Sequence, residues 1–133
     1  PVALGAGIAD SSRKIIALQA DGSAMYTLQA LWSMSREEID VVIVLLNNSS
    51  YNILNVELMR TRSGEPNAKT LSMLDLSDPV IDWVKIAQGM KVEAYKVSRV
   101  EEFDDKFSAA MEKRGPCLIE VIMSQEIGEA IKR

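Results

Sequence analysis

Apolar runs and segments of helical pattern alternate along the chain. Residues 14–20 (KIIALQA) are apolar and partly β-branched, which predicts a buried strand, and residues 41–46 (VVIVLL) are apolar throughout, as is typical of a strand covered on both faces. Further strands are predicted at residues 92–97 and 117–123. Helices are predicted at residues 2–9, from a cap at Ser23 to about residue 35, at about 51–59, and at 82–89, 100–113 and 126–133.

The order of these elements predicts the fold class. Strands that alternate with helices pair in parallel, because parallel neighbours need a crossover connection. We therefore expect an α/β fold, a three-layer α/β/α sandwich with a mainly parallel sheet. Residues 60–78 do not fit this pattern. They are polar and too numerous for an ordinary connector in a compact domain, so we expect a functional or mobile loop there.

Composition and charge narrow the function classes. The chain has 133 residues, the length of one domain, with 47% hydrophobic and 26% charged residues. Its net charge of −4 argues against a nucleic-acid partner, and no run approaches the roughly 20 apolar residues of a membrane span. Residues 1–12 lack the basic start of a secretory signal, which favours a cytoplasmic protein with no membrane partner.

The absence of histidine and the single cysteine restrict the chemistry further. Without histidine, Ser-His-Asp and Cys-His catalysis within this chain are excluded. Cys117 alone can form neither an internal disulfide nor a cysteine cluster for zinc. Any metal ion bound by this chain must therefore be held by oxygen.

Two polar clusters follow the first two predicted strands. They are residues 21–23 (DGS) and residues 47–50 (NNSS). Since ligands of parallel sheets lie beyond the carboxyl ends of the strands, we expect both clusters close together at one edge. The Asp21 carboxylate, the Asn48 amide oxygen and the Ser50 backbone carbonyl are hard ligands, of the kind that Mg²⁺ takes together with phosphate oxygens.

The first cluster also suits a phosphate group. Gly22 lets the backbone approach a phosphate closely, and Ser23 offers a hydroxyl at a helix start, where free N–H groups attract anions. A helix that begins near Tyr51 would direct more N–H groups to the same place. Together the clusters indicate a magnesium-bridged diphosphate site. Taken singly, each is more simply interpreted as a turn, one capping a helix and the other ending a strand.

The spacing of the two clusters resembles a known motif. An Asp-Gly pair is followed by a helix and a strand and then by an Asn-Asn pair, and Asn48 lies 27 positions after Asp21. This arrangement resembles the thiamine diphosphate motif. The segments similar to those of benzoylformate decarboxylase are residues 21–32 (DGSAMYTLQALW), 47–51 (NNSSY) and 115–121 (GPCLIEV). Essentially the whole chain resembles the C-terminal thiamine diphosphate-binding domain of the acetolactate synthase and benzoylformate decarboxylase family.

The resemblance implies roles for individual residues. Asp21, the side chain of Asn48 and the carbonyl of Ser50 would bind Mg²⁺. Leu54 and Glu57 would face the substrate. The cofactor-binding residues that it implies are Gly22, Ser23, Ala24, Tyr51, Asn52 and Ile53.

Two positions depart from the pattern of the family. Ala20 stands where the family usually has glycine, and its methyl group lies at a tight strand end. Glu57 stands where a large aromatic residue usually faces the substrate, and its spacing places it on one helix face with Ile53 and Leu54. An acid there argues against a simple benzoylformate pocket. The alternative interpretation of Glu57 is a solvated helix residue.

The resemblance implies a thiamine diphosphate- and Mg²⁺-binding domain of a 2-oxo acid decarboxylase or carboligase. A glutamate on a pyrimidine-binding domain of the same enzyme, usually from a partner subunit, would activate the cofactor, so we expect a homodimer or homotetramer. Residues 1–133 would then be a single domain, a C-terminal fragment of a larger enzyme that is inactive alone. The alternative is a non-catalytic phosphate- or nucleotide-binding α/β module, against which the Asp21 and Asn48 pair argues.

Overall fold

Four parallel strands form the centre of the protein. The computed structural model describes residues 1–61 and 67–125. Its strands are β1 (Ile15–Ala20), β2 (Val41–Asn47), β3 (Glu93–Val97) and β4 (Cys117–Ile122), and they form one sheet in the order β1-β2-β4-β3. Every neighbouring pair in this sheet is parallel. The predicted α/β fold with a parallel sheet is confirmed.

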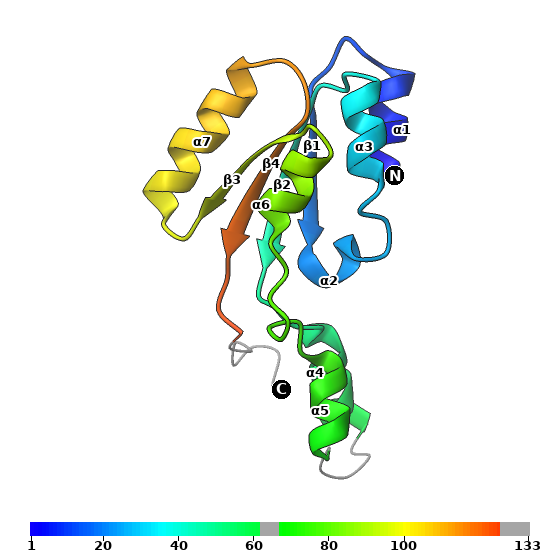
Figure 1. Ribbon diagram of the computed structural model, residues 1–133, viewed down its shortest axis with the longest axis vertical. Coiled ribbons are helices and arrows are strands. Elements are labelled where there is room, and N and C mark those ends of the chain that lie inside the picture. The colour runs from blue at the N-terminus through cyan, green and yellow to red at the C-terminus, as the bar shows by residue number, and fades with distance from the viewer. Residues whose placement is uncertain (62–66, 126–133) are drawn as a thin grey trace.

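Helices cover both faces of this sheet (Figure 1). One face packs against α1 (Val2–Ala9), α3 (Ala30–Arg36) and α6 (Trp83–Gly89), and the buried Leu45 and Leu118 lie in that layer. The other face packs against α7 (Val100–Glu112), whose Ala110, Phe103 and Phe107 meet Val42, Val44 and Ile119. The remaining helices are α2 (Asp21–Ala24), α4 (Asn52–Thr61) and α5 (Ala68–Leu74). The sheet is thus the middle of three layers.

The prediction that the first strand is buried is wrong for one of its faces. Ile15 and Ala17 pack into the core beneath α1, whereas Ile16 is 49% exposed and Leu18 is 73% exposed on the opposite face. On that face α7 contacts β2, β3 and β4, and no helix in the described ranges covers β1. An apolar run therefore marked the strand correctly, but coverage of its second face depends on tertiary packing.

The long loop predicted at residues 60–78 is also wrong at residues 60–61 and 68–74, which are helical. Helix α4 continues to Thr61, and α5 begins after Asn67, whose side-chain Oδ1 accepts a hydrogen bond from the Thr70 backbone N at 2.9 Å. Helices α4 and α5 form a hairpin that projects beyond the sheet (Figure 1). Its inner groove is lined by apolar side chains such as Leu74. Residues 62–66 and the predicted helix at 126–133 lie outside the described residues.

The helix after the first strand starts earlier than predicted. Its N-cap is Ala20, in an extended conformation, and no side chain caps it, so Ser23 is a residue of α2 and not its cap. Turns then lead to α3, which begins at Ala30. None of the described helices is both long enough and apolar enough to span a membrane.

Gly22 of α2 packs against the ring of Tyr51, which lies just before α4. A Cβ atom at position 22 would lie 2.7 Å from Tyr51 Cδ1 and 2.8 Å from Tyr51 Cε1. Contacts that short do not occur between real carbon atoms, so a side chain at this position would displace the ring. Glycine is therefore required here for the packing of α2 against the segment that follows β2.

The substitution Gly22→Ala tests this contact. We expect it to lower the free energy of unfolding by about 1–3 kcal/mol, the usual cost of overpacking. In a Tyr51→Ala background the same change should cost much less, because the ring is gone. The matched control is Gly89→Ala in α6, where a Cβ would meet no atom within 4 Å and which should be neutral or slightly stabilising. Equal costs of Gly22→Ala in both backgrounds, measured by urea unfolding, would show that Tyr51 is not the obstacle.

Cys117 supplies a second test of the fold. Its side chain is 5% exposed in the layer beneath α7, and burial raises the pKa of its thiol to about 11. Because the thiolate is the nucleophile, we expect a thiol reagent at about pH 8 to react with the folded protein at least about a hundredfold more slowly than with the urea-unfolded chain. Similar rates in both states would contradict the buried position.

Candidate functional site

The two predicted clusters meet at the carboxyl edge of the sheet. Strands β1 and β2 are neighbours in parallel register, with Ala20 opposite Leu46. Asp21 directly follows β1 and Asn48 directly follows β2, so both chain segments leave the sheet at the same edge. The two residues line one cavity of about 310 Å³. The parallel pairing of the strands therefore brings together residues that lie 27 positions apart in the sequence.

Nearly all the predicted ligand residues line this cavity. Asp21, Asn48 and Ser50, the predicted metal ligands, lie in its wall. The predicted cofactor-binding residues in its wall are Gly22, Ser23, Tyr51, Asn52 and Ile53. The remaining lining residues are Ala20, Leu46, Met123 and Ser124. Asp21 carries the only charged side chain among these lining residues, so the described part of the cavity wall contains no lysine or arginine.

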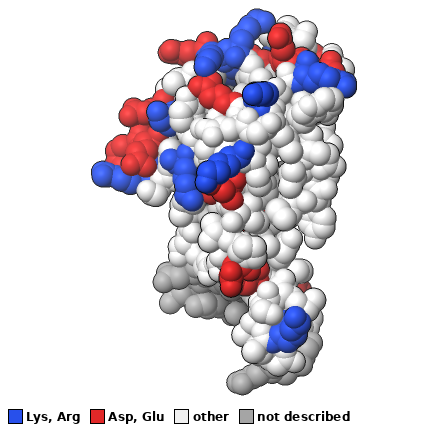
Figure 2. Space-filling view, viewed as in Figure 1, with Lys and Arg blue, Asp and Glu red and all other residues white. Residues whose placement is uncertain are grey.

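The distribution of surface charge agrees with this. Figure 2 shows that most charged side chains on this face gather near the amino ends of the strands and over α7. Fewer of the described charged side chains on this face lie near the carboxyl edge. Among the described residues, an anionic ligand in the cavity would therefore find backbone N–H groups and polar side chains rather than basic residues.

Asp21 is the most unusual residue of the cavity. It is 2% exposed, and its Oδ2 atom is buried without a hydrogen-bond donor among the described residues. A buried carboxylate oxygen without a partner costs free energy, since the water that it leaves is not replaced. A bound cation would supply the missing partner. Nowhere in the described ranges do three His, Cys, Asp or Glu side chains cluster as metal ligands, so a cation here would also need amide and backbone oxygens.

The loop after β2 presents such oxygens. Asn48 Oδ1 accepts a hydrogen bond from the Ser50 backbone N at 3.1 Å, and Asn47 Oδ1 accepts one from the Ser49 backbone N at 2.8 Å. These two bonds form consecutive turns, and Ser49 has a φ of 53°, in the left-handed region. The segment after α5 supports the loop, because Ser50 forms an antiparallel bridge with Asp75. The position of Asn48 and Ser50 is thus fixed from two sides.

Two helix starts contribute backbone donors. Helix α2 begins at Asp21 and α4 begins at Asn52, and the first residues of both line the cavity. The N–H groups of a first helical turn have no acceptor within the helix. They are available to an anion, which the partial positive charge at a helix start also favours. This arrangement supports a phosphate-bearing ligand beside the Asp21 carboxylate.

Three of the predicted site residues lie elsewhere. Ala24 packs against the apolar core beneath α1 and α3. Leu54 and Glu57 line the groove between α4 and α5, and Glu57 Oε1 accepts a hydrogen bond from Arg60 Nη1 at 3.1 Å. Sequence reasoning in turn missed Met123, which follows β4. The signal was available, because β4 pairs with β2 and ends at the same edge.

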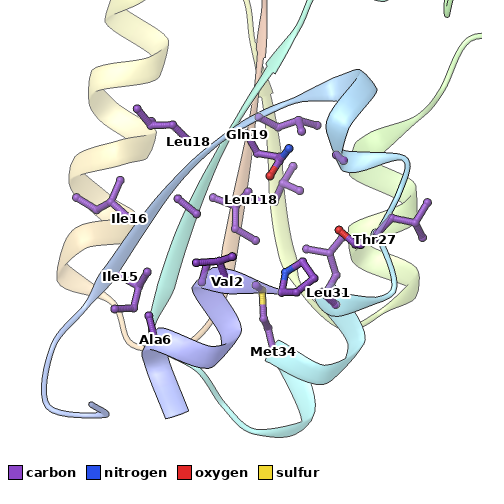
Figure 3. Close-up of a pocket in the computed structure, with 18 of the residues that line it drawn as sticks. Val2, Ala6, Ile15, Ile16, Leu18, Gln19, Thr27, Leu31, Met34 and Leu118 are labelled. Atoms are coloured by element: carbon purple, nitrogen blue, oxygen red, sulfur yellow. The ribbon is translucent and has the colours of Figure 1, made fainter. Parts of the chain in front are cut away.

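A larger cavity on the helical side of β1 does not suit a charged ligand. It measures about 370 Å³ and lies between α1, α3 and the sheet (Figure 3). Apolar side chains such as Leu31, Met34 and Leu118 line it, and Gln19 and Thr27 are its polar members. No charged side chain is among its lining residues. The cavity at the carboxyl edge therefore stays the candidate site.

Known proteins contain the same domain. The family described as thiamine pyrophosphate enzyme, C-terminal TPP binding domain, matches residues 1–121. A protein of Mycobacterium tuberculosis with the provisional name acetolactate synthase large subunit IlvX is 46% identical over 129 residues, which are 96% of this chain and 25% of that protein. Benzoylformate decarboxylase of Pseudomonas aeruginosa is 34% identical over 121 residues, 91% of this chain and 22% of the enzyme.

A solved structure is similar over the same span. The thiamine diphosphate-dependent 4-hydroxybenzoylformate decarboxylase of Rhodococcus jostii RHA1 superposes with a TM-score of 0.83 at 38% identity, covering 93% of this chain and 22% of that one. The chain spans about a quarter of the length of these relatives. With Asp21, Gly22 and Asn48 at one cavity, these similarities show that the chain belongs to the family of C-terminal thiamine pyrophosphate-binding domains of thiamine pyrophosphate enzymes.

Proposed function

We propose that the cavity at the carboxyl ends of β1 and β2 holds the diphosphate of thiamine diphosphate through a magnesium ion. The observation that carries this proposal is the buried Oδ2 of Asp21, which has no hydrogen-bond partner and no basic side chain beside it among the described residues that line the cavity. A diphosphate would be repelled by this carboxylate unless a cation lay between them. A divalent cation would bind the unpartnered Oδ2 atom and would also remove the repulsion between the carboxylate and the diphosphate.

Magnesium suits the oxygen atoms that the cavity offers. Mg²⁺ prefers octahedral oxygen coordination and commonly takes one or two protein carboxylates together with phosphate oxygens. The Asp21 carboxylate, the Asn48 side-chain oxygen and the Ser50 carbonyl would be its protein ligands. The N–H groups at the starts of α2 and α4 would contact the diphosphate oxygens, with Gly22 and Ser23 on one side and Asn52 and Ile53 on the other. Tyr51 would line the same site, with its own N–H donated to the Leu74 carbonyl at 2.9 Å.

In the whole enzyme this domain would anchor and orient the cofactor. Bound thiamine diphosphate supplies the carbanion chemistry, and the protein supplies position and electrostatics. We propose a 2-oxo acid as the substrate and either decarboxylation or carboligation as the reaction. Leu54 and Glu57 stay candidates for the substrate wall, since they lie on α4, the helix that starts at the cavity.

The partner of this domain follows from the same chemistry. A pyrimidine-binding domain of the same enzyme would complete the site, in a homodimer or homotetramer. This chain would then be one domain of a longer protein and would be inactive alone. The chain spans about a quarter of the length of its relatives, which supports this proposal. The cytoplasmic location expected from the sequence stays a prediction.

Removing the Asp21 carboxylate gives the sharpest test of the site. For the wild-type chain we expect thiamine diphosphate with Mg²⁺ to raise the melting temperature by roughly 10 °C at about a hundredfold excess over Kd, because a ligand of the folded state stabilises it by mass action. Asp21→Asn should abolish the Mg²⁺-dependent rise without lowering the stability of the free protein, since it removes an unpartnered charge. Asn48→Ala should also reduce the Mg²⁺-dependent rise in melting temperature, because it weakens cofactor binding.

The matched control is Asp104→Asn on the exposed surface of α7, which should bind the cofactor like the wild type. Adenosine diphosphate with Mg²⁺ serves as the comparison ligand, since equal stabilisation by it would indicate a general diphosphate site. If Asp21→Asn and Asn48→Ala both bind thiamine diphosphate like the wild type, the diphosphate site lies elsewhere. An unchanged wild-type melting curve at millimolar cofactor would count against binding by this chain.

A further inference from the structure

A second buried acid lies next to the site without lining it. Glu120 of β4 is 1% exposed, and its Oε1 atom accepts a hydrogen bond from Asn47 Nδ2 at 2.7 Å. Lys96 of β3 is its partner in the strand register and places Nζ 3.7 Å from the same carboxylate. Glu120 is absent from the cavity wall, so it would not touch a ligand there.

Asn47 links this acid to the loop that carries the proposed metal ligands. Its side chain is held between two partners: Nδ2 donates to Glu120, and Oδ1 accepts from the Ser49 backbone N at 2.8 Å and from Ser49 Oγ at 3.2 Å. Its backbone carbonyl accepts a hydrogen bond from the Met123 N at 2.7 Å. Asn47 is 6% exposed, so water does not compete freely for these bonds.

The chemistry of a carboxylate decides which way this amide points. An ionised carboxylate only accepts hydrogen bonds, so the NH₂ group of Asn47 must face Glu120. Oδ1 then faces Ser49, where it receives the N–H of a residue with a left-handed φ of 53°. An amide pointing the other way would set its NH₂ group against the Ser49 backbone N–H and its oxygen against the Glu120 carboxylate. Hydrogen bonds to a charged group are also stronger than neutral ones.

We propose that Glu120 is a positioning residue, which holds the loop at residues 47–50 in its binding conformation by fixing the orientation of the Asn47 amide. The inference rests on the proposed function, because its purpose would be to present the Asn48 and Ser50 oxygens to the metal. Asn48 follows Asn47 directly, and Ser50 follows Ser49 directly. A loosened Asn47 amide would therefore remove one of the two supports of both proposed ligands, leaving only the bridge between Ser50 and Asp75.

The loop itself can be tested without any ligand, by amide hydrogen exchange measured by NMR on the full chain. In Glu120→Gln, whose amide can face Asn47 either way, we expect the Ser49 N–H to exchange about tenfold faster, relative to the Val44 and Leu45 amides of the sheet. Unchanged relative exchange of Ser49 would overturn the proposal. Lys96→Met is the matched control: it removes the other partner of Glu120, and it should leave the relative exchange of Ser49 unchanged even if it lowers the melting temperature.

A paired substitution separates the hydrogen-bond pattern from general destabilisation. In Glu120→Gln with Asn47→Asp, the new amide at position 120 can donate to the new carboxylate, whose second oxygen still accepts from Ser49. The net charge is unchanged. We expect this double variant to restore Ser49 exchange to within about threefold of the wild type. A double variant that exchanges as fast as Glu120→Gln alone would overturn the proposed direction of the bond.

Mg²⁺ titration at saturating thiamine diphosphate connects the loop to function. Glu120→Gln should raise the Kd for Mg²⁺ about three- to tenfold, whereas Lys96→Met should change it less than about twofold. If Ser49 exchange rises in Glu120→Gln but Mg²⁺ affinity does not change, the link to the metal is wrong. If the wild-type chain shows no Mg²⁺-dependent binding, the proposed function fails for this chain, while hydrogen exchange still decides whether Glu120 positions the loop.

Discussion

The parallel pairing of β1 with β2 is the constraint on which the candidate site depends. Its register sets Ala20 opposite Leu46. Asp21 and Asn48, which follow the two strands, therefore leave the sheet at the same edge. The first turns of α2 and α4 then begin at the same edge. A shift of the register would move the carboxylate away from the amide oxygen. The apolar residues that bury β2 on both faces therefore also set the geometry of the site.

The two buried acids near this edge differ in whether their carboxylate oxygens have partners. Glu120 is satisfied, with Asn47 and Lys96 as partners, and it stabilises the loop after β2. Asp21 has one oxygen without a donor in the described part of the chain, which is unfavourable in the free protein and useful for binding a cation. Stability and function are thus in conflict at Asp21 and in agreement at Glu120. Asp21 thus has the features of a ligand-binding residue, whereas Glu120 has those of a residue that supports its neighbours.

Most of the sheet and of the cavity could be predicted from the sequence because both depend on local patterns. Apolar runs marked β1 and β2, and the polar clusters that follow these two strands marked the cavity. The errors concern features that local patterns do not encode. The exposed face of β1, with Leu18, depends on where α7 packs, and α5 was missed because polar residues surround its apolar positions. The partnership of Glu120 with Asn47 joins two strands and could not be found from spacing alone.

The central claim is that the divalent cation lies between Asp21 and the loop after β2. The most direct measurement replaces Mg²⁺ with paramagnetic Mn²⁺ in the presence of thiamine diphosphate and records which backbone amide signals broaden. We expect the strongest broadening at Asp21, Gly22, Asn48 and Ser50. Strongest broadening at an acidic segment elsewhere, such as Glu101 and Glu102 at the start of α7, with the signals of Asp21 and Asn48 left sharp, would contradict it.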